Sequence, residues 1–155
     1  MEKKDYMRKA IELSIKNMER GGGPFGAVIV KDGEIIAASA NSVTIDNDPT
    51  AHAEVNAIRE ATKKLGTFDL SGCEIYSSCE PCPMCLGAIY WAKIDSLYFG
   101  NTKKDADDIG FSDNFIYEEI DKDYQHRNLK TQTMMRDEAI EAFNIWKNKE
   151  DKIEY

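Results

Sequence analysis

The sequence lacks a long apolar run. In its 155 residues, no stretch approaches the roughly 18 uninterrupted apolar residues that would indicate a membrane-spanning helix. Residues 1–18 mix charged side chains among the apolar ones, which is not the pattern of a secretory signal. We therefore expect neither export nor membrane insertion, and a cytoplasmic location.

An excess of positive charge is also lacking. The chain carries 20 Lys and Arg against 28 Asp and Glu, so its formal net charge is −8. A field of this sign repels a phosphate backbone and disfavours a large nucleic-acid footprint. The balance favours a small molecule as the partner.

No internal repeat, low-complexity tract or linker divides the chain. Hydrophobic residues make up 42% and charged residues 31%, as in ordinary globular proteins. A chain of this length buries roughly 70% of the surface that its unfolded form exposes, so it needs no disulfides to fold. We therefore expect a single domain over residues 1–155.

Two amphipathic helices are predicted in the first half of the chain. Apolar side chains recur every three to four positions in residues 4–18 and again in residues 51–65, and glycines end both patterns. Thr50 is the candidate N-cap of the second helix. Between the helices, residues 25–30 and 34–40 are apolar runs joined by an Asp-Gly pair, which predicts a β-hairpin.

The second half begins with a strand, a helix and another strand. Residues 73–77 and 96–99 have strand character, and residues 82–93 between them favour a helix. This alternation next to a hairpin is typical of an α/β fold with a mixed sheet. Beyond these elements the patterns are weaker and predict a helix at 113–120, a strand at 129–135 and a helix at 137–147.

Two short motifs combine the residues needed for metal chemistry. His52 and Glu54 stand in HAE, and Cys82 and Cys85 stand in PCPMC, each motif at a predicted helix start. A strand-helix-strand arrangement brings such starts to one edge of the sheet, where helix dipoles favour thiolates. Two thiolates and one imidazole give tetrahedral zinc three ligands and leave its fourth position open to water.

A carboxylate beside such a zinc ion has a clear chemical use. Zinc activates water near neutral pH, and the attack on an amidine-like ring carbon also needs a proton on the ring nitrogen and another on the departing amine. Glu54 is placed to carry both protons.

Cys79 offers an alternative metal site. In CEPCPMC the spacings overlap, and His52 with all three cysteines would make a closed, structural Cys₃His site. Such a site leaves Glu54 without a role, and the prolines that flank Cys82 suit a turn into a helix. We therefore favour Cys82 and Cys85 as ligands, and interpret Cys73 and Cys79 as small buried hydrophobes.

HAE and PCPMC resemble the signature of the cytidine-deaminase-like zinc deaminases. Over nearly its full length the chain is similar to the small bacterial guanine deaminases within that superfamily, through GGPFGAVIVKDG, NDPTAHAEVNAIR, SCEPCPMCLGAIYWA, GFSDNFIYEEID and the terminal EY. Deaminases of tRNA adenosine share the metal motifs but are not expected to share FSDNFIYEEI. The last third, apart from these segments, matches loosely.

The resemblance implies a three-layer α/β/α fold with a five-stranded mixed sheet and one zinc ion per chain. It implies hydrolysis of guanine to xanthine and ammonia, a step of purine catabolism. It also implies a homodimer in which C-terminal segments, about residues 137–155, are swapped and cap the partner's active site.

The resemblance also assigns roles to single residues. It implies that His52, Cys82 and Cys85 bind zinc and that Glu54 and Asp113 transfer protons. It also implies that Asn41 binds the purine edge, that Phe25 stacks on the ring face and that Tyr155 closes the pocket.

Four of these residues have ordinary alternatives. Phe25 fits a core strand, Asn41 a turn, Asp113 a helix N-cap and Tyr155 a frayed chain end. Two further functions are also open. The first is another deaminase of the superfamily, acting on tRNA adenosine or cytosine. The second is a structural zinc module without turnover.

Overall fold

The computed structural model describes residues 1–155. The chain separates into two compact units, Met1–Tyr117 and Glu118–Tyr155, which we describe one at a time. None of the helices combines the length and the apolar character that crossing a membrane requires.

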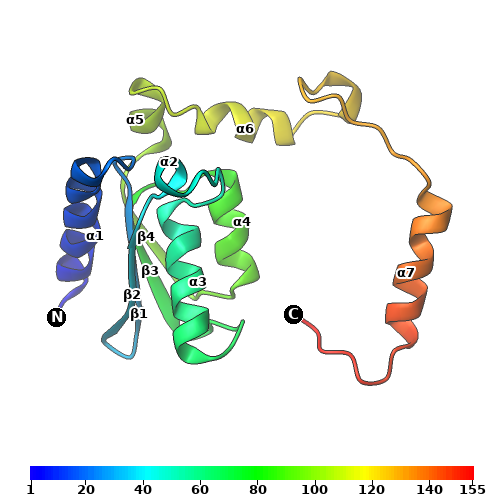
Figure 1. Cartoon of the computed structure of the whole chain (residues 1–155), viewed down its shortest axis with the longest axis horizontal. Coiled ribbons are helices and arrows are strands. Elements are labelled where there is room, and N and C mark those ends of the chain that lie inside the picture. The colour runs from blue at the N-terminus through cyan, green and yellow to red at the C-terminus, as the bar shows by residue number, and fades with distance from the viewer. The chain divides into compact units, whose positions relative to one another are not determined.

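A four-stranded mixed sheet forms the centre of the first unit (Figure 1). The sheet order is β2-β1-β3-β4, in which β1 is antiparallel to both β2 and β3, and β3 is parallel to β4. The hairpin expected at Asp32 and Gly33 is present, and both residues adopt the positive φ that its turn requires (50° and 78°). The strands are β1 (Gly26–Lys31), β2 (Glu34–Ala40), β3 (Cys73–Cys79) and β4 (Ser96–Asn101).

Helices cover both faces of this sheet, as the predicted three-layer α/β/α architecture requires. Helix α1 (Lys3–Asn17) lies on one face, while α3 (Ala53–Leu65) and α4 (Pro83–Trp91) lie on the other (Figure 1). Strand β1 alternates accordingly: Val28 and Val30 pack in a cluster with Tyr6 and Ala10 of α1, whereas Ala27 and Ile29 belong to the opposite core. The central strand is therefore buried on both faces.

The prediction of a fifth strand at 129–135 is wrong, because the sheet has four strands. Residues 129–135 form no regular element, and Leu129, Met134 and Met135 are 77%, 79% and 61% exposed. A strand needs a neighbouring ladder and a buried face to set its register. This segment has neither.

The remaining helices are short, apart from the last one. Two of them, α2 (Val43–Asp46) and α5 (Lys103–Asp108), were not predicted; α6 (Asp113–Ile120) agrees with the predicted span, and α7 (Arg136–Asn148) extends the predicted one slightly. Two 3₁₀ turns, Met18–Arg20 and Tyr124–His126, complete the chain.

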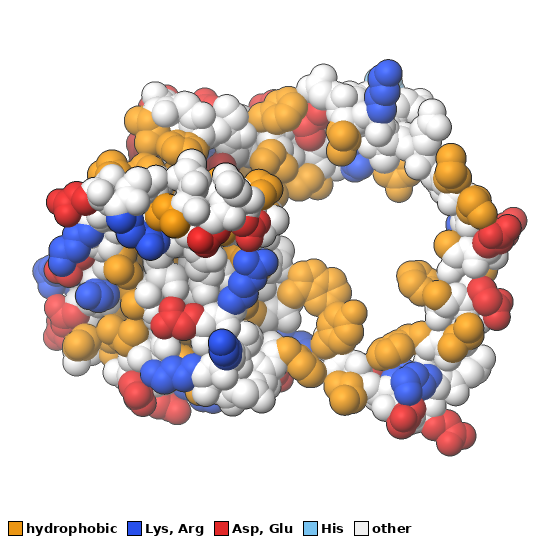
Figure 2. Space-filling model, in the orientation of Figure 1, with side chains coloured by type: hydrophobic (Ala, Val, Ile, Leu, Met, Phe, Trp, Pro, Cys, Tyr) orange, Lys and Arg blue, Asp and Glu red, His pale blue; other side chains and the backbone are white.

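The second unit has no hydrophobic core of its own. No residue from Glu118 to Tyr155 is buried. On α7, Phe143 is 72% exposed, Ile145 63% and Trp146 41%, and hydrophobic side chains of this unit are visible on the molecular surface (Figure 2). An amphipathic helix of this kind obtains most of its stability from packing against another surface.

Candidate active site and metal centre

The two motifs found in the sequence lie at the starts of α3 and α4. His52 is the N-cap of α3 and Cys82 the N-cap of α4, both in an extended conformation, and Pro83 occupies the first turn of α4. The prediction of Thr50 as the N-cap is wrong, because α3 begins at Ala53, two residues later than predicted; the Thr50 hydroxyl donates to Asp48 Oδ1 (2.6 Å). The helix dipoles favour negative charge at both helix starts.

His52, Cys82 and Cys85 form a compact group of metal-ligand atoms. His52 Nδ1 lies 3.6 Å from Cys82 Sγ and 3.5 Å from Cys85 Sγ, and the three ligand atoms are all within 4.8 Å of one another. Tetrahedral zinc, with bonds of about 2.3 Å to sulfur and about 2.0 Å to nitrogen, separates such ligands by about 3.5 Å. The donor set and its spacing therefore fit a zinc ion with one open position.

Cys79 does not belong to this group. Its thiol contacts the carbonyl of Thr102 (3.8 Å), and burial raises its pKa to about 12. Cys73 is fully buried in the core between the sheet and α3. The closed Cys₃His alternative therefore has no counterpart in the geometry.

Electrostatics prepare the site for a cation. Hydrogen bonds from the Cys85 thiol and then from His52 hold the pKa of Cys82 far below its usual range. The hydrogen bond to Cys82 raises the pKa of His52. A thiolate at a helix N-terminus beside an imidazole is the arrangement that a soft divalent metal prefers.

Glu54 lies in the first turn of α3, next to the metal group. Its side chain is only 6% exposed, and burial raises the pKa of its carboxyl to about 7. A group that exchanges protons during a reaction is most effective when its pKa lies near the working pH. Burial therefore suits Glu54 to proton transfer.

A cavity of about 330 Å³ opens onto these groups and is formed by the first unit alone. Most of its lining is apolar or neutral, and its charged or titratable members gather at the metal group. The lining residues are Gly23, Phe25, Asn41, Val43, Thr44, Pro49, His52, Glu54, Cys79, Glu80, Cys82, Phe111 and Asp113. A cavity of this size, with few polar groups, is typical of a small-molecule site.

Two of the residues expected to bind the purine, and the second acidic group expected to transfer protons, line this cavity. The ring of Phe25 meets Phe111 edge-on, with centroids 4.9 Å apart and planes at 88°. Asn41 is 7% exposed; its Oδ1 accepts from the amide of Val43 (3.1 Å), and its Nδ2 makes no hydrogen bond within the chain. Asp113 begins α6, and burial raises the pKa of its carboxyl.

Tyr155 lies in the second unit and is 73% exposed. Its part in closing the cavity stays a prediction, as do the catalytic and binding roles of the other site residues.

Two residues that line the cavity, Phe111 and Glu80, were not predicted from the sequence. Phe111 was not singled out, although it stands in GFSDNF two positions before Asp113. Glu80 precedes the PCPMC motif, lines the cavity and accepts a hydrogen bond from the amide of Lys103 (3.0 Å) at the start of α5. No local pattern marks Glu80 for this contact, because it depends on how β3 and α5 meet.

Comparisons with known proteins agree with this geometry. Residues 1–101 match the family model described as the cytidine and deoxycytidylate deaminase zinc-binding region. The chain is 49% identical to the guanine deaminase of Bacillus subtilis, over 100% of both chains. The crystal structure of that enzyme matches with a TM-score of 0.96, covering 100% of this chain and 99% of the other.

Two other relatives match at lower identity and over a smaller part of the chain. The tRNA-specific adenosine deaminase of Aquifex aeolicus is 43% identical, over 67% of this chain and 69% of its own. A solved guanine deaminase from Nitrosomonas europaea is 36% identical with a TM-score of 0.70, covering 72% of this chain and 65% of that chain.

Proposed function

Because the chain belongs to the cytidine and deoxycytidylate deaminase family with its zinc-binding region, we propose that it is a zinc-dependent guanine deaminase. The similarity to the Bacillus subtilis guanine deaminase carries this proposal, since it combines 49% identity with coverage of the whole chain, including the residues beyond 101 that the family model does not cover. The tRNA-specific adenosine deaminases are less similar: that of Aquifex aeolicus is 43% identical over 67% of the chain, and that of Buchnera aphidicola is 34% identical over 93%.

The reaction replaces the exocyclic amino group at C2 of guanine by oxygen. Water adds at C2, ammonia leaves, and the oxygen stays as the C2 carbonyl of xanthine. Zinc, when bound by His52, Cys82 and Cys85, makes water a nucleophile at neutral pH. Glu54 accepts a proton as the oxygen attacks and delivers it to N3. It then takes the second proton from the hydroxyl on C2 and passes it to the amine, so that ammonia leaves as the C2 carbonyl forms.

The other cavity residues bind and orient the purine. Phe25 stacks on the ring face, which is worth roughly 1–3 kcal/mol for a base on an aromatic side chain. Asn41 donates its free Nδ2 hydrogens to an acceptor on the purine edge. Asp113 accepts a hydrogen bond from the exocyclic amine and orients this amine for protonation by Glu54.

We further propose a homodimer in which the second unit of one copy completes the site of the other. The second unit buries none of its residues, while Phe143, Ile145, Trp146 and Ile153 present apolar surface. A segment of this composition is stable only against a further surface. In the dimer, Tyr155 closes the cavity of the partner.

Ammonia release from a panel of substrates tests the substrate assignment. Guanine is expected to lose its absorbance with release of one ammonia per xanthine. Guanosine, adenine, cytosine and a tRNA anticodon stem are assayed separately as alternative substrates. Ammonia from the tRNA stem or from cytosine, with none from guanine, would identify another deaminase of the family. A protein that binds zinc and releases no amine from any of them would be a structural zinc module.

A further inference from the structure

The backbone around Asn41 is held by partners from four different segments. The carbonyl of Ala40 accepts from Asn56 Nδ2 (3.0 Å), and the amide of Asn41 donates to the carbonyl of Phe25 (3.1 Å). The carbonyl of Asn41 accepts from Asn17 Nδ2 (2.8 Å), and the amide of Ser42 donates to the carbonyl of Ala51 (2.9 Å). Every hydrogen-bonding group of the two peptide units that flank Asn41 is thus satisfied.

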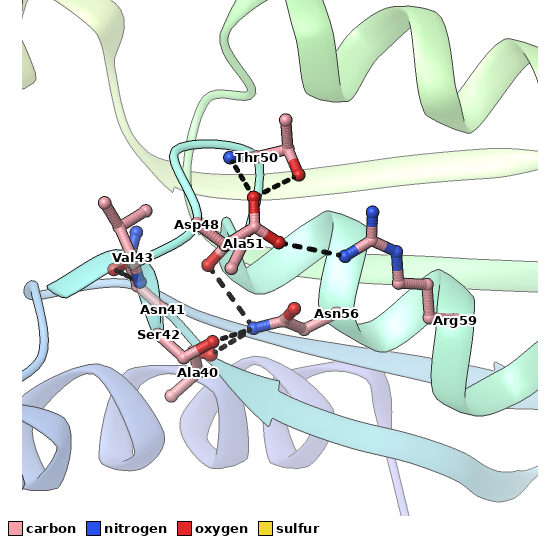
Figure 3. Close-up of polar contacts among 9 residues, drawn as sticks. All are labelled: Ala40, Asn41, Ser42, Val43, Asp48, Thr50, Ala51, Asn56 and Arg59. Atoms are coloured by element: carbon pink, nitrogen blue, oxygen red, sulfur yellow. Dashed lines mark hydrogen bonds and ion pairs between the residues drawn. The ribbon is translucent and has the colours of Figure 1, made fainter. Parts of the chain in front are cut away.

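Asn56 supplies one side of this arrangement from α3 (Figure 3). Besides the carbonyl of Ala40, its Nδ2 reaches Ser42 Oγ (3.0 Å) and the carbonyl of Ala51 (3.3 Å). Its own backbone amide donates to the carbonyl of His52 (2.9 Å). One side-chain amide therefore ties the end of β2 to the helix start that carries the metal-binding histidine.

Asn17 supplies the other side from the end of α1. It is 1% exposed, and the two hydrogens of its Nδ2 point to the carbonyls of Gly23 (2.7 Å) and Asn41 (2.8 Å). Gly22 leaves room for this contact, because a Cβ there would lie 2.3 Å from Asn17 Nδ2 and 2.7 Å from the carbonyl oxygen of Asn41. The space beside Asn41 is thus kept for the Asn17 amide.

These contacts decide what the side chain of Asn41 can offer to a ligand. With the backbone fixed on both sides and Oδ1 engaged by the amide of Val43 (3.1 Å), Nδ2 is the group left to face the cavity. A buried donor that is held in place discriminates strongly between ligands with and without a matching acceptor.

We propose that Asn17 and Asn56 act as an asparagine clamp, two positioning residues that set purine affinity and selectivity through Asn41. The inference rests on the proposed guanine deaminase function. Neither side chain lines the cavity beside the metal group, so neither is a catalytic residue.

The effect of the clamp differs from a general loss of stability. Asn41 binds the purine edge and takes no part in the proton path, so its displacement weakens substrate binding and leaves the chemical step largely intact. A carboxylate of the same shape cannot donate to the backbone carbonyls. For Asn56→Asp we expect KM for guanine to rise about tenfold, with kcat within about threefold of wild type and full zinc content.

Matched controls exist on both helices. Ser14 on α1 and Thr62 on α3 each donate a hydroxyl to a backbone carbonyl, of Ile11 (2.6 Å) and Ile58 (2.9 Å), away from residues 40–42. Ser14→Ala and Thr62→Val lose comparable bonds and are expected to keep the KM of the wild type, whatever they do to the melting temperature.

A double-mutant cycle gives the decisive readout. Asn17→Asp, Asn56→Asp and the control variants are each measured in the wild-type and the Asn41→Ala backgrounds, for KM, kcat, zinc content and Tm. If the clamp acts through Asn41, Asn56→Asp raises KM about tenfold in the first background and has little effect in the second. Asn56 is only partly buried and carries the test alone if Asn17→Asp does not fold.

Two results would overturn the inference, and they differ from a failure of the proposed function. An unchanged KM in a folded Asn56→Asp protein would overturn it, as would an equal rise of KM in both backgrounds. In both cases the wild type still turns over guanine. Absence of guanine turnover in the wild type would overturn the proposed function, and this inference with it.

Discussion

The two units of the chain differ in how they obtain their stability. Met1–Tyr117 has a sheet whose central strand is buried on both faces, and side chains such as Ala27, Ile29 and Ile75 are fully buried. Glu118–Tyr155 contains the end of α6, one 3₁₀ turn and α7, but buries no residue. The first unit therefore has a hydrophobic core that holds a rigid site. The second unit needs another surface to cover its apolar side chains.

This difference indicates a division of roles. Metal ligands and proton-transfer groups must be held within fractions of an ångström, which rigid helices and strands achieve. Closing a cavity over a ligand tolerates a mobile element, and loops or lids commonly serve this purpose. The metal group and cavity lie in the first unit, whereas Tyr155 ends the second.

The largest effect is expected from removing a metal ligand in the first unit. Cys85→Ala leaves two ligands, so zinc content should fall and guanine turnover should drop at least about 10⁴-fold, since the metal supplies the nucleophile. Metal analysis and ammonia release measure both. Cys73→Ala, a control at a buried cysteine of β3 outside the metal group, should keep zinc and activity. Stoichiometric zinc in Cys85→Ala would show that the ligand set is wrong.

Glu54→Gln separates the chemistry from the metal site. The amide cannot carry the protons, so kcat should fall about 10²- to 10⁴-fold while zinc remains bound. In the wild type, kcat/KM should also fall as the pH falls through the pKa of Glu54, because the carboxylate is the form that accepts the first proton. Glu60→Gln on the exposed part of the same helix is the control. Turnover that survives in Glu54→Gln would contradict the shuttle assignment.

Phe25→Ala tests substrate binding in the first unit. Loss of stacking should weaken guanine binding by roughly 1–3 kcal/mol, seen as a higher KM, with zinc retained. Phe25 also packs against the core, so Tm is measured in parallel and Phe25→Leu serves as the variant that keeps the packing. If Phe25→Leu and wild type share one KM, the ring does not stack on the purine.

The smallest effect is expected from an apolar truncation in the second unit. Phe143→Ala should weaken the dimer by about 1–2 kcal/mol and leave the unfolding of the first unit unchanged. Light scattering over a dilution series measures the shift, and the Tm of the dimer should then depend on protein concentration. Glu141→Ala on the same helix is the control. A concentration-independent loss of Tm would mean that Phe143 packs within its own chain.

The sequence predicts best where local rules and the tertiary structure agree. The Asp-Gly turn places the hairpin correctly, and β2 and α6 agree with their predicted spans. HAE and PCPMC identify the three members of the metal group, because each motif is local and lies at a helix start. Zinc chemistry could thus be predicted from the two motifs alone.

Other features depend on contacts that no local pattern contains. Residues 129–135 have the composition of a strand but no neighbour to pair with. Helix α5 is six residues long and was missed, although the capping box between Thr102 and Asp105 was a usable signal. The roles of Asn17 and Asn56 are invisible in the sequence, since their acceptors lie up to 24 residues away.

Complementation between two impaired variants tests the division of roles most directly. One chain carries Glu54→Gln with an intact C-terminus, and the other keeps Glu54 but ends at Ile153. The two are coexpressed with different tags and purified as a mixed dimer. If the second unit completes the partner's site, each mixed dimer has one site with both Glu54 and Tyr155, and guanine turnover recovers to about half of the wild-type rate per dimer. Turnover no greater than the mean of the two parent dimers would contradict the account.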